Sequence, residues 1–128
     1  ILLSMDEIIK KREKFNKAFN LPLSEKPTLI TATRKRLMFE LMYEELHEYG
    51  DAQNLKEIAD AITDMLEILL DIAAKHGMLH KLPELYDEVH KSNMSKLNEN
   101  GKPIYRQDGK VLKGANYFKP ELEKILKK

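Results

Sequence analysis

Two short segments of the sequence carry carboxylates at spacings that suit a metal site. Glu45 and Glu48 lie three residues apart in one predicted helix, and Glu57 and Asp60 lie three apart in the next. Side chains three or four positions apart share one face of a helix, so two antiparallel helices can gather these acids around one point. Mg²⁺ and Mn²⁺ select oxygen ligands, and Mg²⁺ also binds phosphate oxygens. The pattern predicts a divalent-metal site that acts on a phosphorylated substrate.

The first pair of acids is predicted to face inward. On a helical wheel, Glu45 and Glu48 fall within an apolar stripe that is formed by Leu37, Met38, Leu41 and Met42. Burial of a lone ionised carboxylate is unfavourable, so such a pair must be protonated, paired with cations or bound to metal. Arg34 or Arg36 could supply the cation, and this alternative stays open at the level of sequence.

A longer strip of acids runs along the second of these helices. Its members follow spacings of three and four and are Glu57, Asp60, Asp64, Glu67 and Asp71. Because no Lys or Arg is interleaved, neighbouring acids repel one another by a few tenths of a kcal/mol per pair when exposed. A bound cation would remove this conflict, and Asp64 is counted among the predicted metal ligands. An ordinary solvated face is the alternative interpretation of the strip.

Glu44 precedes the inward pair and has a different orientation. It lies about a hundred degrees from Glu45 around the helix, so it can approach the site only from one side. Glu44 and His47 also form a Glu-x-x-His unit, which di-iron carboxylate bundles use twice. The sequence offers only Asp87 with His90 as a second unit, with Asp in place of Glu. A di-iron site is therefore the less favoured alternative.

Composition excludes several classes of protein. The 128 residues suffice for one domain with a modest core, and no apolar run approaches the roughly 20 residues of a membrane-spanning helix. The absence of cysteine excludes disulfides and thiolate metal sites and is compatible with a cytoplasmic location. A net charge of +1 argues against a nucleic-acid polymer as partner. We expect a cytoplasmic protein that binds neither membranes nor nucleic acids.

The order of apolar repeats at helical spacing, of helix-capping residues and of helix-breaking residues predicts an all-α fold. Helices are expected over about 4–19, from Thr31 or Thr33 to a stop at Gly50, from Asn54 to about Gly77, and from Pro83 onward. These form a four-helix-bundle-like core over about 4–96, followed by an irregular tail over about 97–128. An Asp108-Gly109 turn indicates a small hairpin in this tail. The whole chain is interpreted as one domain.

The third predicted helix is apolar over an arc of about 200°, which is wider than packing on one partner requires. Its apolar residues include Ile58, Ile62, Met65, Leu66, Leu69 and Ile72. Such breadth indicates burial from several sides, and we expect a homodimer or a homotetramer.

The acidic motifs resemble those of a known family. Glu44-Glu45-Leu46-His47-Glu48 followed by Glu57-Ile58-Ala59-Asp60 is similar to the E-E-x-x-E and E-x-x-D pair of the all-α nucleotide pyrophosphohydrolases, the superfamily of MazG and the dimeric dUTPases. The segments 15–27 and 87–118, which contain Glu88-Val89-His90-Lys91-Ser92-Asn93-Met94-Ser95-Lys96 and Gly114-Ala115-Asn116-Tyr117-Phe118, resemble the phosphoribosyl-ATP pyrophosphohydrolase branch. Only eight residues separate Glu48 from Glu57, fewer than in many MazG proteins, so a MazG-like substrate preference does not follow.

The resemblance implies roles for individual residues. It implies that Glu45, Glu48, Glu57 and Asp60 hold Mg²⁺, or Mn²⁺ in its place. It makes Glu44 a candidate to position or activate water, and Asn93 and Lys96 candidates to contact the phosphates of a nucleotide substrate. The implied reaction is hydrolysis between the α and β phosphates, which gives a nucleoside monophosphate and pyrophosphate. The alternative is a non-catalytic helical module that keeps the fold and binds a nucleotide or a protein.

Overall fold

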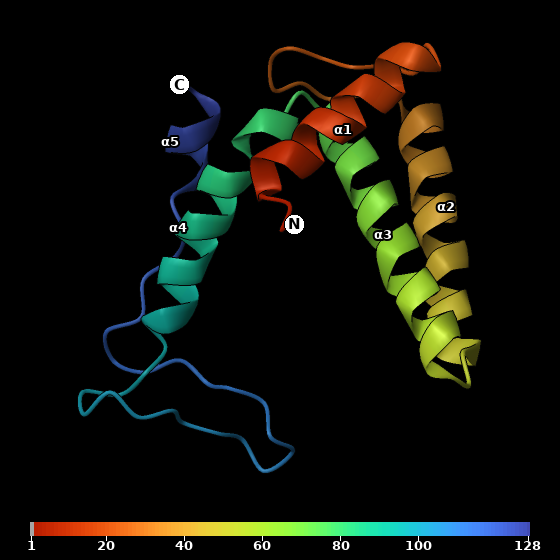
Figure 1. The fold of residues 1–128 in the computed structure, drawn as a ribbon. Helices are drawn as coiled ribbons and strands as arrows, with labels where there is room; N and C mark the ends of the chain where they lie inside the picture. Colours follow the sequence, from red (N-terminus) through yellow and green to blue (C-terminus); the bar gives the residue numbers. More distant parts are fainter. Residues whose placement is uncertain (1) are drawn as a thin grey trace. The chain divides into compact units, whose positions relative to one another are not determined.

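The computed structural model describes residues 2–128. The chain forms two compact units, and the boundary between them in the sequence lies between His80 and Lys81. In chain order its helices are α1 (Met5–Ala18), α2 (Ala32–Asp51), α3 (Leu55–Lys75), the 3₁₀ turn η1 (Leu79–Lys81), α4 (Leu82–Met94) and α5 (Leu122–Leu126) (Figure 1). Residues 2–128 contain no regular strand, since Tyr105 and Val111 form only an isolated antiparallel bridge. The all-α prediction is confirmed.

Local capping sets where the helices of the first unit begin. The side chains of Ser4, Thr31 and Asn54 accept hydrogen bonds from backbone N–H groups in the first turns of α1, α2 and α3. An N-cap side chain satisfies one of the backbone donors that a helix start leaves free, and it stabilises the helix by about 1 kcal/mol. Thr31 and Asn54 therefore act as the caps that the sequence indicates.

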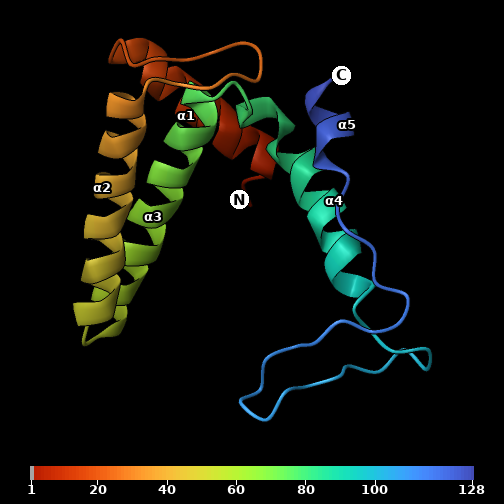
Figure 2. The same cartoon turned by 180° about the vertical axis from the view of Figure 1, so that it is seen from behind.

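Helices α2 and α3 form an antiparallel hairpin, and they lie side by side when viewed from opposite sides (Figures 1 and 2). The predicted stop of α2 at Gly50 is wrong, because the helix continues through Gly50 to Asp51. Glycine within a helix costs about 1 kcal/mol relative to alanine, which does not by itself end a helix. The chain leaves the helix at Ala52, and only residues 52–54 separate α2 from α3.

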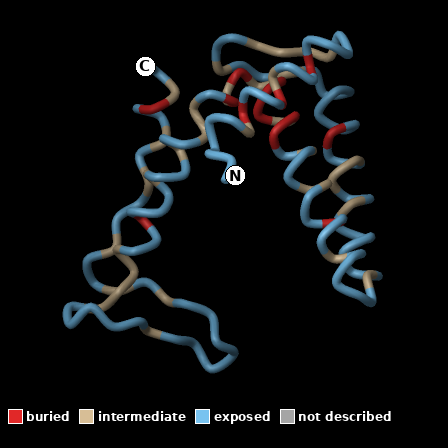
Figure 3. The backbone as a smooth tube through the Cα atoms, viewed as in Figure 1, coloured by how far each residue is buried: buried red, intermediate tan, exposed pale blue. Residues whose placement is uncertain are grey.

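Helix α1 packs against the C-terminal half of α3. Most of the buried residues of the first unit lie in this region (Figure 3). The buried apolar residues there include Ile9, Leu70, Ala73 and Ala74. The loop that follows α1 is also fastened to this end of α3, because the Ser24 N–H donates to Ala74 O at 3.0 Å. The contacts of α1 and of the following loop therefore fix the C-terminal end of α3.

Gly77 permits the close approach of this loop to the end of α3. Its φ of +70° is one that residues with a Cβ rarely adopt, and a Cβ built there would lie 1.9 Å from the backbone oxygen of Lys26. The Thr28 N–H donates to His76 O at 2.9 Å and holds the loop beside the glycine. The predicted end of the third helix near Gly77 agrees with the observed end at Lys75.

The second unit consists of α4, an irregular tail and α5. Pro83 lies in the first turn of α4, as predicted. The buried Ser92 hydroxyl donates to Phe118 O at 2.8 Å, so the returning tail is attached to α4. The predicted hairpin is present in a minimal form, since the bridge between Tyr105 and Val111 encloses a turn with Gly109 at φ +87°.

Helix α4 and the tail together form the second unit, whereas α1, α2 and α3 form the first. The assignment of the whole chain to one domain stays a prediction. None of the helices in residues 2–128 has the length and apolar content that a membrane-spanning segment requires.

Candidate metal centre

Three of the predicted ligands converge between α2 and α3. Glu45, Glu48 and Asp64 each offer a carboxylate oxygen, and these three oxygens all lie within 4.8 Å of one another. Two ligand oxygens that bind one Mg²⁺ at about 2.1 Å lie roughly 3–4 Å apart, so only a small adjustment is needed for all three to reach one ion. Glu45 and Asp64 are half-buried and Glu48 is exposed, so the cluster opens to solvent on one side.

Glu45 is the carboxylate of this cluster that has a buried oxygen without a hydrogen-bond donor within residues 2–128. Its Oε2 atom is buried and has no hydrogen-bond partner among the residues that the structure describes. Burial raises the pKa of Glu45, and the negative charges of Glu48, Asp64 and Asp60 raise this pKa further. A buried acceptor without a donor is unfavourable in the absence of a proton or a cation. The cluster is therefore electrostatically suited to bind a cation.

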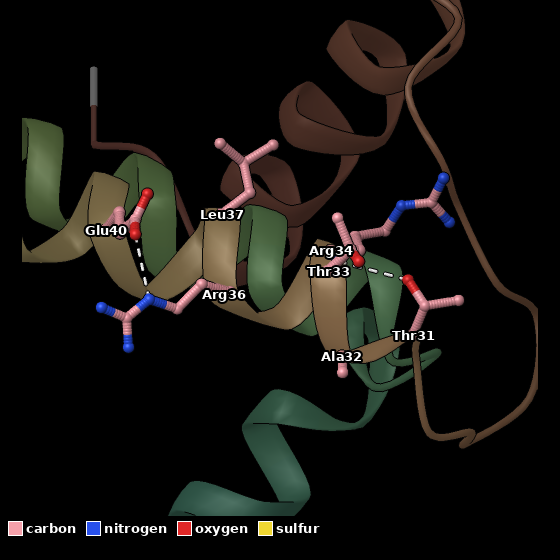
Figure 4. Close-up of a pocket in the computed structure, with 7 residues that line it drawn as sticks. All are labelled: Thr31, Ala32, Thr33, Arg34, Arg36, Leu37 and Glu40. Carbon is pink, nitrogen blue, oxygen red and sulfur yellow. Dashed lines mark hydrogen bonds and ion pairs between the residues drawn. The ribbon is translucent and has the colours of Figure 1, made fainter.

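The arginines that could have neutralised these acids lie elsewhere. Arg36 Nε donates to Glu40 Oε1 at 2.9 Å, one turn further along α2 (Figure 4). Arg34 lies in the first turn of the helix, where its N–H donates to Thr31 Oγ1 at 3.2 Å. Both arginines line an open hollow of about 740 Å³ at the start of α2, which contains none of the predicted site residues. Within residues 2–128, neither arginine forms an ion pair with Glu45 or Glu48.

A smaller hollow of about 270 Å³ adjoins the carboxylate cluster at the α2–α3 turn. It is lined by Glu48, Asp51, Ala52, Glu57 and Asp60. Asp60 contributes to the negative field at Glu45, so it belongs to the same electrostatic site. Glu57 lines the hollow but lies outside the group of three converging carboxylates, and its Oε2 accepts a hydrogen bond from the Gln53 N–H at 2.9 Å.

The acidic strip on α3 is not uniform, because its last two acids have basic partners that lie outside the strip. Arg12 Nη1 lies 3.0 Å from Glu67 Oε2, and Arg12 Nη2 lies 3.4 Å from Asp71 Oδ1. Lys75 Nζ lies 2.6 Å from Asp71 Oδ2. The buried Asn16 also donates to Asp71 Oδ1 at 3.0 Å. The last two acids of the strip therefore belong to an ion-paired network between α1 and α3.

Sequence reasoning missed both cations of this network. Lys75 lies four residues after Asp71, a spacing at which opposite charges on a helix pair, so a local signal for it was present. Arg12 lies in a different helix, 55 residues before Glu67, and no local pattern connects the two.

The remaining predicted site residues do not belong to the group of three converging carboxylates. Glu44 is exposed on α2, beside Glu45 in sequence but on another face of the helix. Asn93 is exposed near the end of α4, and its backbone oxygen accepts from the Lys96 N–H at 3.1 Å. Lys96 O accepts in turn from the Gly114 N–H at 2.8 Å, so the tail holds this segment. Asn93 and Lys96 both belong to the second unit.

Comparison with known proteins identifies the family. The profile of the phosphoribosyl-ATP pyrophosphohydrolase family matches residues 12–93, a segment that contains the carboxylate cluster and most of the helical part of the chain. The chain therefore belongs to the phosphoribosyl-ATP pyrophosphohydrolase family, and it is a pyrophosphohydrolase, as its motifs predict.

Among solved structures, the chain is similar to a protein from Exiguobacterium sp. 255-15 that is named a "putative NTP pyrophosphohydrolase". The two sequences are 21% identical over 90% of each chain, and the TM-score is 0.30. No match is found among curated proteins.

Proposed function

We propose that this pyrophosphohydrolase uses Mg²⁺ to hydrolyse a nucleoside triphosphate or a related nucleotide between its α and β phosphates. The products would be a nucleoside monophosphate and pyrophosphate. The observation that carries the proposal is the buried Oε2 of Glu45, which lies beside Glu48 and Asp64 and has no hydrogen-bond partner within residues 2–128. Mn²⁺ would also suit this site, because its ligands are all carboxylate oxygens.

The donor set fits a hard divalent ion. Glu45, Glu48 and Asp64 would hold it, and Asp60 would add negative charge beside them. An ion bound there would neutralise phosphate charge and lower the pKa of a water molecule. The open side at Glu48 leaves room for phosphate oxygens and water, which Mg²⁺ usually keeps among its ligands.

The protein's own side chains would then direct the hydrolysis. Glu44, exposed on the neighbouring face of α2, would accept a proton from the attacking water at a carboxylate oxygen. The water oxygen would bond to phosphorus as the anhydride oxygen departs with the pyrophosphate. Asn93 and Lys96 would contact the substrate phosphates, where a cationic amine offsets the charge that develops on the leaving group.

We also propose that the protein acts as a homodimer or a homotetramer. One face of α3 carries Ile62, Leu66 and Leu69 at helical spacing, and their side chains are 53%, 37% and 49% exposed. Contiguous exposed apolar side chains of this kind are typical of subunit interfaces. Light scattering should show a mass of two or four chains, and a mass of one chain would contradict this part of the proposal. The cytoplasmic location and the lack of a nucleic-acid partner stay predictions.

Release of pyrophosphate tests the proposed reaction. The purified protein is incubated with a panel of nucleoside triphosphates and with phosphoribosyl-ATP, each with Mg²⁺ and with chelator. We expect Mg²⁺-dependent release of pyrophosphate from at least one substrate. Asp64→Asn should lower kcat/KM by about 100-fold, which corresponds to roughly 2.7 kcal/mol of transition-state stabilisation.

Glu67→Gln provides the matched control for Asp64→Asn. Glu67 is an acid of the same strip, three residues further along α3, but its carboxylate pairs with Arg12 instead of joining the cluster. We expect this variant to keep kcat/KM within about threefold of the wild-type value. Equal activities of the Asp64→Asn variant and the wild type would contradict the assignment of the site.

A further inference from the structure

The irregular tail of the second unit leaves the C-terminal end of α4 and returns along this helix to α5 (Figures 1 and 2). We propose that Lys113, in the returning part of the tail, is a second lysine that contacts the phosphates of the nucleotide substrate, beside Lys96. This inference rests on the proposed function, in which Lys96 contacts these phosphates. Lys113 lies outside residues 12–93, which the family profile matches.

Two serines at the end of α4 attach the returning tail. The Ser92 hydroxyl is buried and donates to Phe118 O at 2.8 Å. Ser95 Oγ accepts from the Phe118 N–H at 3.1 Å and donates to Ser92 O at 2.6 Å. Both backbone groups of Phe118 are therefore held by serine hydroxyls, and the tail has a defined position at this end of the helix.

Gly114 allows the tail to approach the end of α4 closely. Its N–H donates to Lys96 O at 2.8 Å, and a Cβ built on Gly114 would lie 2.5 Å from Leu97 O. The covalent bonds on either side of this hydrogen bond place the Cα atoms of Lys96 and Lys113 within about 8 Å of each other. Lysine side chains are flexible and carry three donors each, so both ammonium groups can reach one diphosphate.

Within residues 2–128, neither lysine forms an ion pair, and Lys113 Nζ lies 4.7 Å from the centre of the Tyr117 ring. Most acids of the second unit already pair with other cations, and these acids are Glu84, Asp87, Asp108, Glu121 and Glu123. Neighbouring cations without counter-charges attract anions, and phosphate oxygens accept strong hydrogen bonds from ammonium groups. The pair of lysines therefore suits the diphosphate part of a nucleotide.

Titration of the full chain with inorganic pyrophosphate tests this role. Amide signals of the isotope-labelled protein are followed by NMR without metal at 0.15 M salt. We expect Lys113→Gln to raise the Kd for pyrophosphate about fivefold, because one charged contact at an exposed site is lost. Lys96→Gln should raise it by a similar factor.

Lys110→Gln provides the matched control, because it removes the same charge from the same tail. Lys110 lies on the other side of the Tyr105–Val111 bridge from Lys113, about 10 Å away along an extended chain. The salt screens charges over about 8 Å, so this variant should keep the Kd within about twofold of the wild-type value.

Gly114→Ala tests the position of Lys113 without a change of charge. The added Cβ would meet Leu97 O, so the tail must move away from α4. We expect the Kd for pyrophosphate to rise at least threefold. The amide signals of α1, α2 and α3 serve as the control for folding of the first unit.

An equal Kd in Lys113→Gln and Lys110→Gln would overturn the role of Lys113, and a wild-type Kd in Gly114→Ala would overturn its placement by the tail. Failure of the wild-type protein to bind pyrophosphate would overturn the inference as well. A wild-type Kd in Lys96→Gln would also contradict the contact proposed for Lys96. Release of pyrophosphate from a nucleotide is measured separately, so the proposed reaction can hold when the role of Lys113 fails.

Discussion

The two ends of the acidic strip on α3 have opposite surroundings. At its C-terminal end, Asp71 is buried and lies within ion-pair distance of both Arg12 and Lys75. Toward its N-terminal end, Asp64 lies beside Glu45 and Glu48, and the buried Oε2 of Glu45 has no partner within residues 2–128. The same helical spacing thus occurs in a buried ion-pair network at one end and, toward the other end, in a cluster of acids that has no basic partner within residues 2–128.

The difference teaches that spacing alone does not distinguish a structural carboxylate from a functional one. Both ends repeat acids at intervals of three and four, and the cations at the C-terminal end come partly from another helix. Removal of one partner from a buried ion pair leaves an uncompensated charge, which is strongly destabilising. Removal of one acid from a cluster of like charges relieves repulsion instead. Mutations at the two ends should therefore affect stability in opposite directions.

The largest change in stability is expected at the C-terminal end of the strip, where the acids form ion pairs. Asp71→Ala removes the common partner of Arg12 and Lys75, both of which are buried. We expect the free energy of unfolding to fall by about 3–5 kcal/mol in urea denaturation. The control is Arg36→Gln, which breaks the exposed pair with Glu40 and should change stability by less than about 1 kcal/mol. Similar small changes in both variants would show that the buried network contributes little.

A change in stability of intermediate size is expected when a metal ion binds to the cluster of Glu45, Glu48 and Asp64. Mg²⁺ at about 100 times its Kd should stabilise the wild-type protein by about 2.7 kcal/mol, because it binds the folded state and not the unfolded chain. Glu48→Gln should lose most of this gain in a thermal-shift titration, and Glu67→Gln should keep it, since Glu67 already pairs with Arg12. An equal gain in both variants would place the ion elsewhere.

The smallest effect concerns the pH dependence of the metal-free protein. Burial and the neighbouring acids raise the pKa of Glu45 in the folded state above its ordinary value. The folded state therefore holds the Glu45 proton to a higher pH than the unfolded chain does. The stability contributed by this group is present below the ordinary Glu pKa and is lost as pH rises through the raised pKa.

Urea denaturation in the presence of chelator at several pH values checks this sign. The wild-type free energy of unfolding, relative to that of Glu45→Gln, should decline as pH rises through the raised pKa of Glu45. Because Gln does not titrate, the variant serves as the reference at each pH. A difference that grows with pH would mean that the Glu45 carboxylate is stabilised in its ionised form by the metal-free protein.

Much of the fold could be predicted because its signals are local. Thr31, Asn54 and Pro83 mark the starts of α2, α3 and α4 through capping chemistry and a fixed φ angle. The apolar stripe that contains Glu45 and Glu48 correctly indicated a half-buried carboxylate at Glu45, whereas Glu48 is exposed. Gly50 misled because one glycine within a helix costs only about 1 kcal/mol relative to alanine, and α2 continues through it to Asp51.

The contacts of Arg12 were missed because they join residues that are distant in the sequence. Arg12 reaches Glu67 and Asp71 only because α1 packs on α3, and that packing has no signature in either segment. At Glu57 two local patterns overlap, since the residue fits both an E-x-x-D motif and a cap with Asn54. The role of Glu57 as a ligand of the metal ion stays a prediction.

The location of a bound ion tests the central claim most directly. Crystals grown with Mn²⁺ should give an anomalous scattering peak about 2.2 Å from carboxylate oxygens of Glu45, Glu48 and Asp64, the distance expected for a divalent ion and oxygen ligands. The paired acids Glu67 and Asp71 should show no such peak. A protein saturated with Mn²⁺ that places the ion away from Glu45, or that shows Glu45 hydrogen-bonded and without an ion, would contradict the account.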